Sequence, residues 1–262
     1  MYPQQWLDPI PIIGVFVLIA GLLLVVFEVG HRVGRWWQEK TPDEKEGPTS
    51  MLVGSLLALM AFLLAVTMGM ASDRFDTRRA LVLDEANSIG TTFLRAGYLP
   101  EPARTDSRAL LREYVPLRIN VADRQLLAAN FARSTQIHAE LWSIAEDLAR
   151  DTPDSVVLGL YIDSLNETID LHSKRATAII YARVPETVVI LLIIGAALTL
   201  GMVGYSAGLT RRRSFLGAAV LVIVLSAVLT LVVDLDRPRD GFLQVSQQPL
   251  MDLQDQIGPP TS

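Results

Sequence analysis

The chain has 262 residues, half of them hydrophobic, with a mean hydropathy of +0.34 and a formal net charge of −5. This hydropathy is high for a soluble domain and indicates a membrane protein. The segment 72–183 carries 14 Lys or Arg and 16 Asp or Glu, a net charge of −2. A nucleic-acid surface needs a basic excess, so we expect no nucleic-acid partner. The absence of cysteine from the sequence excludes disulfides, thiol chemistry and cysteine metal sites.

The first predicted span covers about residues 10–30, an uncharged apolar run followed by a short polar end. Gly14 and Gly21 lie seven residues apart on one face of this helix, which indicates a contact with another helix. Residues 41–48 are polar, contain two prolines and predict a loop. The first and second spans are therefore expected to form a hairpin within a domain covering 1–72.

Residues 49–97 predict one very long helix or two nearly collinear helices. The part covering 49–72 has no charged residue and forms the second predicted span. No proline or strong stop signal separates it from the charged run 73–79, so the helix can continue beyond the bilayer. Steps of 3.6 residues select a face of small residues that becomes charged where the helix leaves the membrane. These candidate pore-lining residues are Gly54, Ala58, Ala61, Ala65, Gly69, Ser72, Asp76 and Arg79.

This face has two interpretations, which the residues alone leave open. Small side chains let helices approach closely in lipid, so the face can pack against another helix. Alternatively, several copies of the helix line a narrow pore, with Asp76 and Arg79 as a ring of charge at its mouth. On a solvated face, the same two side chains would instead pair with each other and anchor the helix at the headgroups.

The segment 73–183 predicts an extramembrane antiparallel helix bundle, because apolar residues recur in it at helical spacing. His138 and His172 can meet across neighbouring helices, but no further ligand accompanies them at metal-binding spacing. We expect them to have a core or surface role and to bind no metal. The long helix also carries a polar stripe that faces either its neighbours or a water-filled vestibule. The residues of this stripe and its flank are Asp84, Asn87, Ser88, Thr91 and Arg95.

A second hairpin is predicted over 184–234, with spans at about 186–210 and 214–234. The first of these spans contains two pairs of small residues spaced four apart, at the ends of 197–201 and 204–208. This spacing predicts close packing against a neighbouring helix over much of the span.

The C-terminal tail, 235–262, predicts a short amphipathic helix that lies against the bundle or the headgroups. Asp residues gather where the tail begins, and hard cations such as calcium prefer carboxylate ligands. Arginines are interleaved with them, so we expect a network of salt bridges and no metal. The residues of this post-span motif are Asp234, Asp236, Arg237 and Asp240.

The sequence contains no phosphate-binding loop, dinucleotide fingerprint, zinc-protease motif or nucleophile elbow, so we expect neither an enzyme nor a cofactor. The pattern predicts an all-α membrane protein with four transmembrane helices in two hairpins that flank an extramembrane bundle. The leading functional hypothesis is an oligomeric channel-like pore for small ions, lined by the second span. The alternative is a non-conducting membrane sensor or scaffold whose bundle binds a partner.

Two stretches of the sequence resemble a bacterial family that is classified as bestrophin-like. They are Arg74-Phe75-Asp76-x-Arg78-Arg79 with Glu85-Ala86-Asn87-x-Ile89-Gly90-Thr91-Thr92-x-Leu94-Arg95 and Leu99-Pro100, and then Asp236-Arg237-Pro238-x-x-Gly241. The resemblance covers about 50–250. Bestrophins are pentameric anion channels with four spans, a helical domain between spans two and three, and a pore lined by span two. The resemblance therefore implies a homo-oligomer, a pentamer, with this layout.

Two arguments about orientation in the bacterial cytoplasmic membrane disagree. The predicted hairpin turns carry seven Lys or Arg in short loops, whereas the opposite side carries eight near its span ends, spread over more sequence. The positive-inside rule applies to short loops, so their charge density favours cytoplasmic turns and an extracytoplasmic bundle. The bestrophin resemblance implies a cytoplasmic bundle instead.

Overall fold

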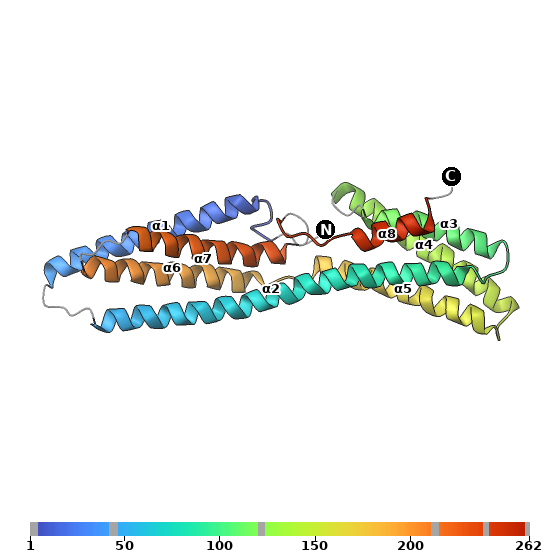
Figure 1. Cartoon of the computed structure of the whole chain (residues 1–262), viewed down its shortest axis with the longest axis horizontal. Coiled ribbons are helices and arrows are strands. Elements are labelled where there is room, and N and C mark those ends of the chain that lie inside the picture. Colours follow the sequence, from blue (N-terminus) through green and yellow to red (C-terminus); the bar gives the residue numbers. More distant parts are fainter. Residues whose placement is uncertain (1–4, 42–46, 120–123, 211–214, 238–240, 260–262) are drawn as a thin grey trace. The chain divides into compact units, whose positions relative to one another are not determined.

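The structure is a computed structural model that describes residues 5–41, 47–119, 124–210, 215–237 and 241–259. These residues form helices and contain no strand, which confirms the all-α fold class. The helices of Figure 1 are α1 (Ile12–Lys40), α2 (Gly47–Ala96), α3 (Ala103–Ile119), α4 (Arg124–Asp151), α5 (Val156–Ile180), α6 (Glu186–Leu209), α7 (Phe215–Asp236) and α8 (Gln248–Ile257).

Four of these helices, α1, α2, α6 and α7, are long and apolar enough to cross a membrane. This confirms the four predicted spans. Contacts divide the chain into a membrane unit, residues 1–75 and 182–244, and a bundle unit, residues 76–181 and 245–262. The membrane unit holds α1, α6, α7 and the first part of α2, and the bundle unit holds the remaining helices and the rest of α2.

The long helix α2 runs without interruption for 50 residues. The charged run 73–79 lies inside it, which confirms the prediction that the helix continues past its apolar part. No proline lies in its interior, so every turn can keep its backbone hydrogen bonds. One helix therefore contributes to the cores of both units.

Glycines bring α1 and α6 into direct backbone contact. A methyl group added at Gly30 would overlap the carbonyl oxygen of Gly201, and one added at Gly204 would overlap that of Phe27. Gly34 and Gly208 are equally crowded by the facing backbone. Such close approach in lipid requires glycine, because any larger side chain would force the helices apart.

The prediction that the small residues of the third span pack against a neighbour is therefore correct, and the neighbour is α1. Gly14 and Gly21 of the first span, which the sequence predicts at a helix contact, take no part in this crossing. A methyl group at Gly21 would meet nothing within 4 Å, and one at Gly14 would meet only residues of the same chain segment, beginning with Ile10. The contact instead uses Gly30 and Gly34, because α1 continues as a helix to Lys40.

The bundle unit has a core of aromatic and aliphatic side chains in which Tyr114, Tyr161 and Leu141 are fully buried. Burial of an aliphatic side chain such as Leu141 contributes about 1.5–3 kcal/mol to the free energy of folding. The C-terminal helix α8 belongs to this unit and buries Leu250, Leu253 and Ile257, its apolar face.

Candidate functional site

The candidate pore-lining face of α2 is exposed in the single chain. We call its membrane part the small-residue strip, Gly54, Ala58, Ala61, Ala65 and Gly69, and all five are exposed. A methyl group added at Gly54 or Gly69 would meet nothing within 4 Å. Within the described residues, no helix of the same chain therefore fills the space beside these two glycines.

Two other sides of α2 differ from this strip. Its buried face, Met60, Leu64, Thr67 and Ala71, packs into the membrane unit. A large apolar strip, Leu52, Leu59, Phe62 and Val66, is exposed like the small-residue strip. At 100° per residue, the centre of the small-residue strip lies roughly 130° from that of the buried face and roughly 105° from that of the large apolar strip. Small and large apolar side chains thus occupy separate sides of one helix.

The small-residue strip continues in register into polar and charged positions. Ser72 is half-buried, and Asp76 and Arg79 are exposed. No ion pair joins Asp76 to Arg79 in this part of α2, where both residues are described, so the pairing that the headgroup-anchoring alternative implies does not occur in the structure. Both charges are left available to solvent or to another molecule.

The predicted polar stripe is divided between two environments. Ser88 is buried and forms a hydroxyl–hydroxyl bond of 2.8 Å with Thr168 of α5. Arg95 donates to the carbonyl oxygen of Leu160 at 2.6 Å and lies 3.6 Å from a carboxylate oxygen of Asp163. These two residues tie α2 to α5 and do not face an open space.

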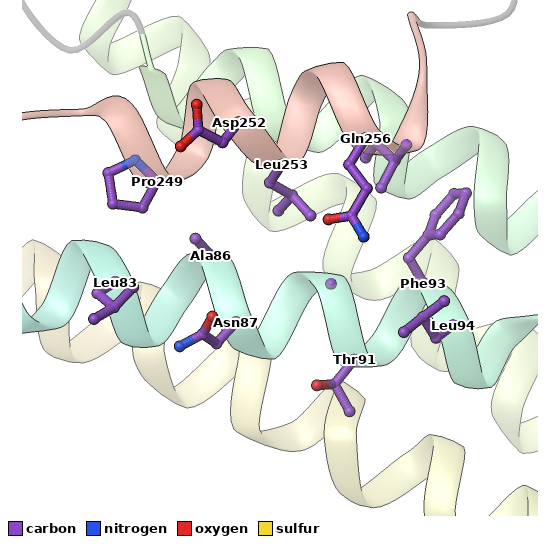
Figure 2. A pocket seen from close by; sticks show the side chains of 12 residues that line it. Leu83, Ala86, Asn87, Thr91, Phe93, Leu94, Pro249, Asp252, Leu253 and Gln256 are labelled. Carbon is purple, nitrogen blue, oxygen red and sulfur yellow. The ribbon is translucent and has the colours of Figure 1, made fainter.

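The remaining residues of the stripe are on the outside of the bundle unit. Asp84, Asn87 and Thr91 are exposed. Asn87 and Thr91 line a groove of about 540 Å³ between α2 and α8, which Figure 2 shows with Asp252 and Gln256 on its far side. Of the stripe residues, Asp84, Asn87 and Thr91 remain candidates for lining a water-filled vestibule.

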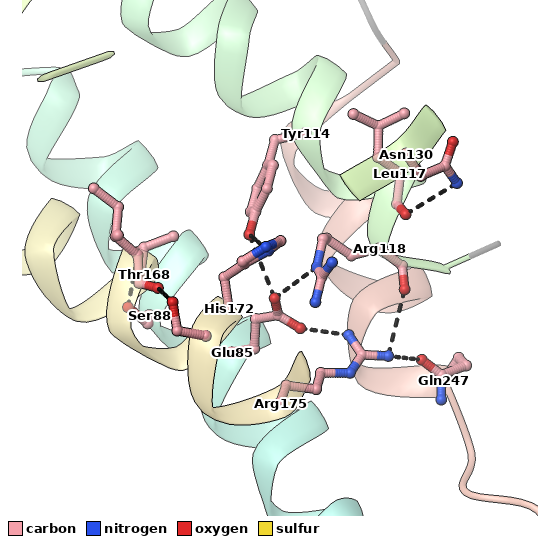
Figure 3. Close-up of polar contacts among 12 residues, drawn as sticks. Glu85, Ser88, Tyr114, Leu117, Arg118, Asn130, Thr168, His172, Arg175 and Gln247 are labelled. Atoms are coloured by element: carbon pink, nitrogen blue, oxygen red, sulfur yellow. Dashed lines mark hydrogen bonds and ion pairs between the residues drawn. The ribbon is translucent and has the colours of Figure 1, made fainter. Parts of the chain in front are cut away.

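A buried ionic joint, which the sequence argument missed, connects four segments of the bundle unit. Its centre is Glu85 of α2, which is fully buried. Its Oε1 accepts a hydrogen bond of 2.7 Å from Arg118 of α3, and its Oε2 accepts one from Arg175 of α5. Arg175 also donates to the side-chain oxygen of Gln247, just before α8 (Figure 3).

Two histidines and a tyrosine complete this joint. The hydroxyl of Tyr114 donates to Glu85 Oε1 at 3.4 Å and lies 3.2 Å from Nδ1 of His172 (Figure 3). The rings of His138 and His172 meet edge to face with centroids 4.9 Å apart. The two histidines, which the sequence allowed to meet across neighbouring helices, do meet. Burial, together with the charge of Arg118, lowers the pKa of His138 to about 4 and that of His172 to about 3. Both imidazoles are neutral near pH 7.

The post-span motif forms backbone contacts at the end of α7. Asp234 accepts hydrogen bonds from the backbone N–H groups of Phe242 at 2.8 Å and Leu243 at 3.1 Å. A methyl group at Gly241 would overlap the Asp234 carboxylate, so the chain passes close to it. The aspartate thus holds the backbone of 241–243 close to the end of α7.

The second aspartate of the motif lies in a salt-bridge network. Asp236 accepts a hydrogen bond from the Val184 N–H at 2.6 Å and one from Arg183 at 3.2 Å. Arg183 also binds both carboxylate oxygens of Asp8, at 2.7 and 2.9 Å. Burial raises the pKa of Asp8, but the hydrogen bond and charge of Arg183 outweigh this and hold the pKa below its usual value. The sequence predicts salt bridges between these aspartates and the interleaved arginines, whereas the salt bridge to Asp236 comes from Arg183, which lies far away in sequence.

The other two residues of the motif are Arg237 and Asp240. Arg237 donates to the carbonyl oxygen of Leu7. Asp240 lies outside the described residues. Within the parts of the chain that the structure describes, no group of three or more His, Cys, Asp or Glu is placed to hold a metal ion.

The family model and the solved structures that match this chain point to the same family. The family model of the bestrophin-like domain matches residues 17–250. A bestrophin homologue from Klebsiella pneumoniae is 15% identical, with 94% of this chain and 95% of that chain covered and a TM-score of 0.65. Two mutated forms of the Klebsiella pneumoniae homologue have TM-scores of 0.66 and 0.68, at 15% and 14% identity, with 92% of this chain covered and 96% and 93% of theirs. No curated protein matches the chain.

Proposed function

Because the chain belongs to the bestrophin-like family of multi-pass membrane proteins, we propose that several copies assemble into a channel-like pore for small ions. The small-residue strip of α2 would line this pore. The observation that carries the proposal is the open space beside Gly54 and Gly69, which no helix in the described part of the chain fills. A scaffold built from one chain would be expected to cover such a face with one of its own helices.

The rest of the membrane unit supports this interpretation of small residues. Where α1 and α6 cross, each of Gly30, Gly34, Gly204 and Gly208 meets the facing backbone. At this crossing, the small residues allow the two helices to approach closely. By the same reasoning, we infer that the uncovered strip of α2 faces either a second copy of the chain or an aqueous lumen.

Exposure to lipid alone is a poorer explanation of the small-residue strip. Lipid chains are as apolar as leucine, so a face that contacts lipid can carry large apolar side chains. The helix α2 already presents Leu59, Phe62 and Val66 on a different side. Two exposed strips of different character indicate two different neighbours. The large apolar strip suits lipid, and the small-residue strip suits a pore axis.

The charges support a pore mouth at the end of the strip. Asp76 and Arg79 follow it in register, are exposed and do not pair with each other. Ions that pass along such a lining need no covalent chemistry, only a constriction and charged entrances. We place the assembly in the bacterial cytoplasmic membrane, with the bundle on the extracytoplasmic side as the density of positive charge in the short loops favours.

Ion flux in liposomes tests this proposal. Ala65→Leu and Gly69→Leu introduce a large side chain on the small-residue strip and are expected to abolish most of the flux or to disrupt assembly. Val66→Leu introduces the same side chain on the large apolar strip and is the matched control, with flux within about twofold of the unsubstituted protein. Normal assembly and normal flux in both strip variants would refute the pore assignment.

A further inference from the structure

The histidine pair of the bundle unit is built in a way that the proposed pore does not explain. His138 on α4 and His172 on α5 are both more than nine-tenths buried, with 8% and 7% of their surface exposed. The ring of Tyr114 lies 5.0 Å from that of His138, and the ring of Phe131 lies 5.2 Å from that of His172. Nε2 of His138 is buried and has no hydrogen-bond partner. A proton added to this nitrogen would therefore have no hydrogen-bond acceptor.

The charges facing the pair come from three helices. Arg118 and the Tyr114 hydroxyl approach from α3, Arg175 lies on α5, and Glu85 approaches from α2. Both oxygens of Glu85 already accept hydrogen bonds from the two arginines. An imidazolium formed here would therefore face two guanidinium groups and a carboxylate that is already engaged. Protonation of either imidazole therefore brings like charges close together in a buried site, which is unfavourable.

We propose that the His138–His172 pair is an acid-sensitive latch, whose protonation opens the bundle around Glu85 and releases α2 from α3 and α5. The joint is suited to this role because it is the place where the three helices and the segment before α8 are tied together (Figure 3). Opening would expose both imidazoles to water, where each binds a proton near pH 6.5. The inference does not depend on ion conduction, since the latch acts on the bundle unit itself.

The size of the effect follows from proton linkage. In the closed bundle, the pKa of His138 is about 4 and that of His172 about 3, whereas the open bundle binds protons near pH 6.5. The open form binds more protons, so the closed form loses stability as the pH falls below about 6.5. Between pH 7 and pH 5, the opening equilibrium should rise roughly 20-fold for each histidine and a few hundredfold for the pair.

A single cysteine can report this opening, since the chain has none of its own. Ser134 lies one turn before His138 on α4, is fully buried, and its hydroxyl has no hydrogen-bond partner. Ser134→Cys would react with a pyridyl disulfide only when the bundle opens. Ser173→Cys, at an exposed position of α5, is the matched control. The ratio of the two reaction rates cancels the pH dependence of thiol chemistry.

We expect this ratio to rise by a few hundredfold between pH 7 and pH 5 in the full-length protein. In a His138→Gln, His172→Asn background, which cannot gain the charge, it should change less than about threefold. A flat ratio with both histidines present overturns the latch. An undiminished rise after both imidazoles are removed also overturns it, because other groups would then cause the opening. If the double variant is already open at pH 7, the single variants decide: each should keep only a roughly 20-fold rise, and a full rise in both contradicts the proposal.

Discussion

Replacing the central carboxylate of the joint should destabilise the bundle more than any comparable change at its surface. In Glu85→Gln, Arg118 and Arg175 remain buried, with only 3% of each side chain exposed, but their shared anion is gone. The amide can accept hydrogen bonds but carries no charge. Two guanidinium groups then face each other without compensation in a site closed to water.

The magnitude follows from measurements on other buried ion pairs. Removing one partner of such a pair typically costs about 3–5 kcal/mol, because the remaining charge is buried and unpaired. For a protein of this size, each kcal/mol lowers the midpoint of thermal unfolding by about 2–4 °C. We therefore expect Glu85→Gln to lower the unfolding midpoint of the bundle by roughly 6–20 °C.

The chain supplies a matched control for this substitution. Glu113 binds Arg133 through two hydrogen bonds of 2.6 and 2.7 Å, but this pair is partly exposed, with 42% and 29% of the side chains accessible. Exposed ion pairs contribute about 0–1 kcal/mol, so Glu113→Gln should shift the midpoint by less than about 4 °C. Thermal exposure of the Ser134→Cys thiol measures both midpoints in the bundle specifically.

Equal midpoints for Glu85→Gln and Glu113→Gln would refute the reasoning. Such a result would mean that water or rearrangement compensates the two arginines, and that the joint does not hold the bundle together. A large shift in Glu85→Gln alone would identify the buried carboxylate as the element that fixes α2 in the bundle.

Three further substitutions test other parts of the structure. Gly204→Ala should separate α1 from α6 and lower the stability of the membrane unit, measured by thermal aggregation in detergent, whereas Gly21→Ala should not; equal effects would contradict the crossing. Asp76→Arg and Arg79→Glu should change the ion preference of flux in liposomes, and unchanged permeability with normal assembly would leave these residues only a headgroup-anchoring role. A cysteine at the exposed position Asp106 should react with an impermeant thiol reagent in intact spheroplasts; reaction only after lysis would place the bundle in the cytoplasm.

The long helix was predictable because its signals are local. An uncharged run of bilayer length leads into 73–79 without a proline, so the sequence itself indicates that α2 continues. The amphipathic helix α8 was predictable for the same reason, since Leu250, Leu253 and Ile257 follow helical spacing. Local periodicity specifies helices and their apolar faces well.

The buried joint was not predictable in this way. Periodicity selected Asp84 for the polar stripe, whereas its neighbour Glu85 is the buried residue. The partners of Glu85 lie 33 and 90 residues away, and nothing near Arg175 in sequence distinguishes it from a solvated arginine. Only the packing of α2, α3 and α5 decides which charges are removed from water. One signal was present: Arg118 lies at helical spacing among the apolar residues of α3.

The glycines of the first span show the same limit. Gly14 and Gly21 have the spacing of a helix contact but meet no other helix within the described residues of the chain, whereas Gly30 and Gly34 form the contact with α6. Both pairs satisfy helical periodicity, and only the position of α6 distinguishes them. A pattern can thus predict that a helix has a close neighbour without identifying the contact residues.

The most direct test of the pore is the accessibility of single cysteines on α2 to water-soluble reagents in the membrane. Ala65→Cys and Gly69→Cys lie on the small-residue strip, and Val66→Cys lies on the large apolar strip. If the small-residue strip lines an aqueous lumen, a charged methanethiosulfonate should label the first two cysteines and block flux in liposomes, while Val66→Cys stays unlabelled in lipid. Labelling of Val66→Cys but not of Ala65→Cys or Gly69→Cys, or no labelling of any of them with flux intact, would contradict the proposal that this face of α2 lines a pore.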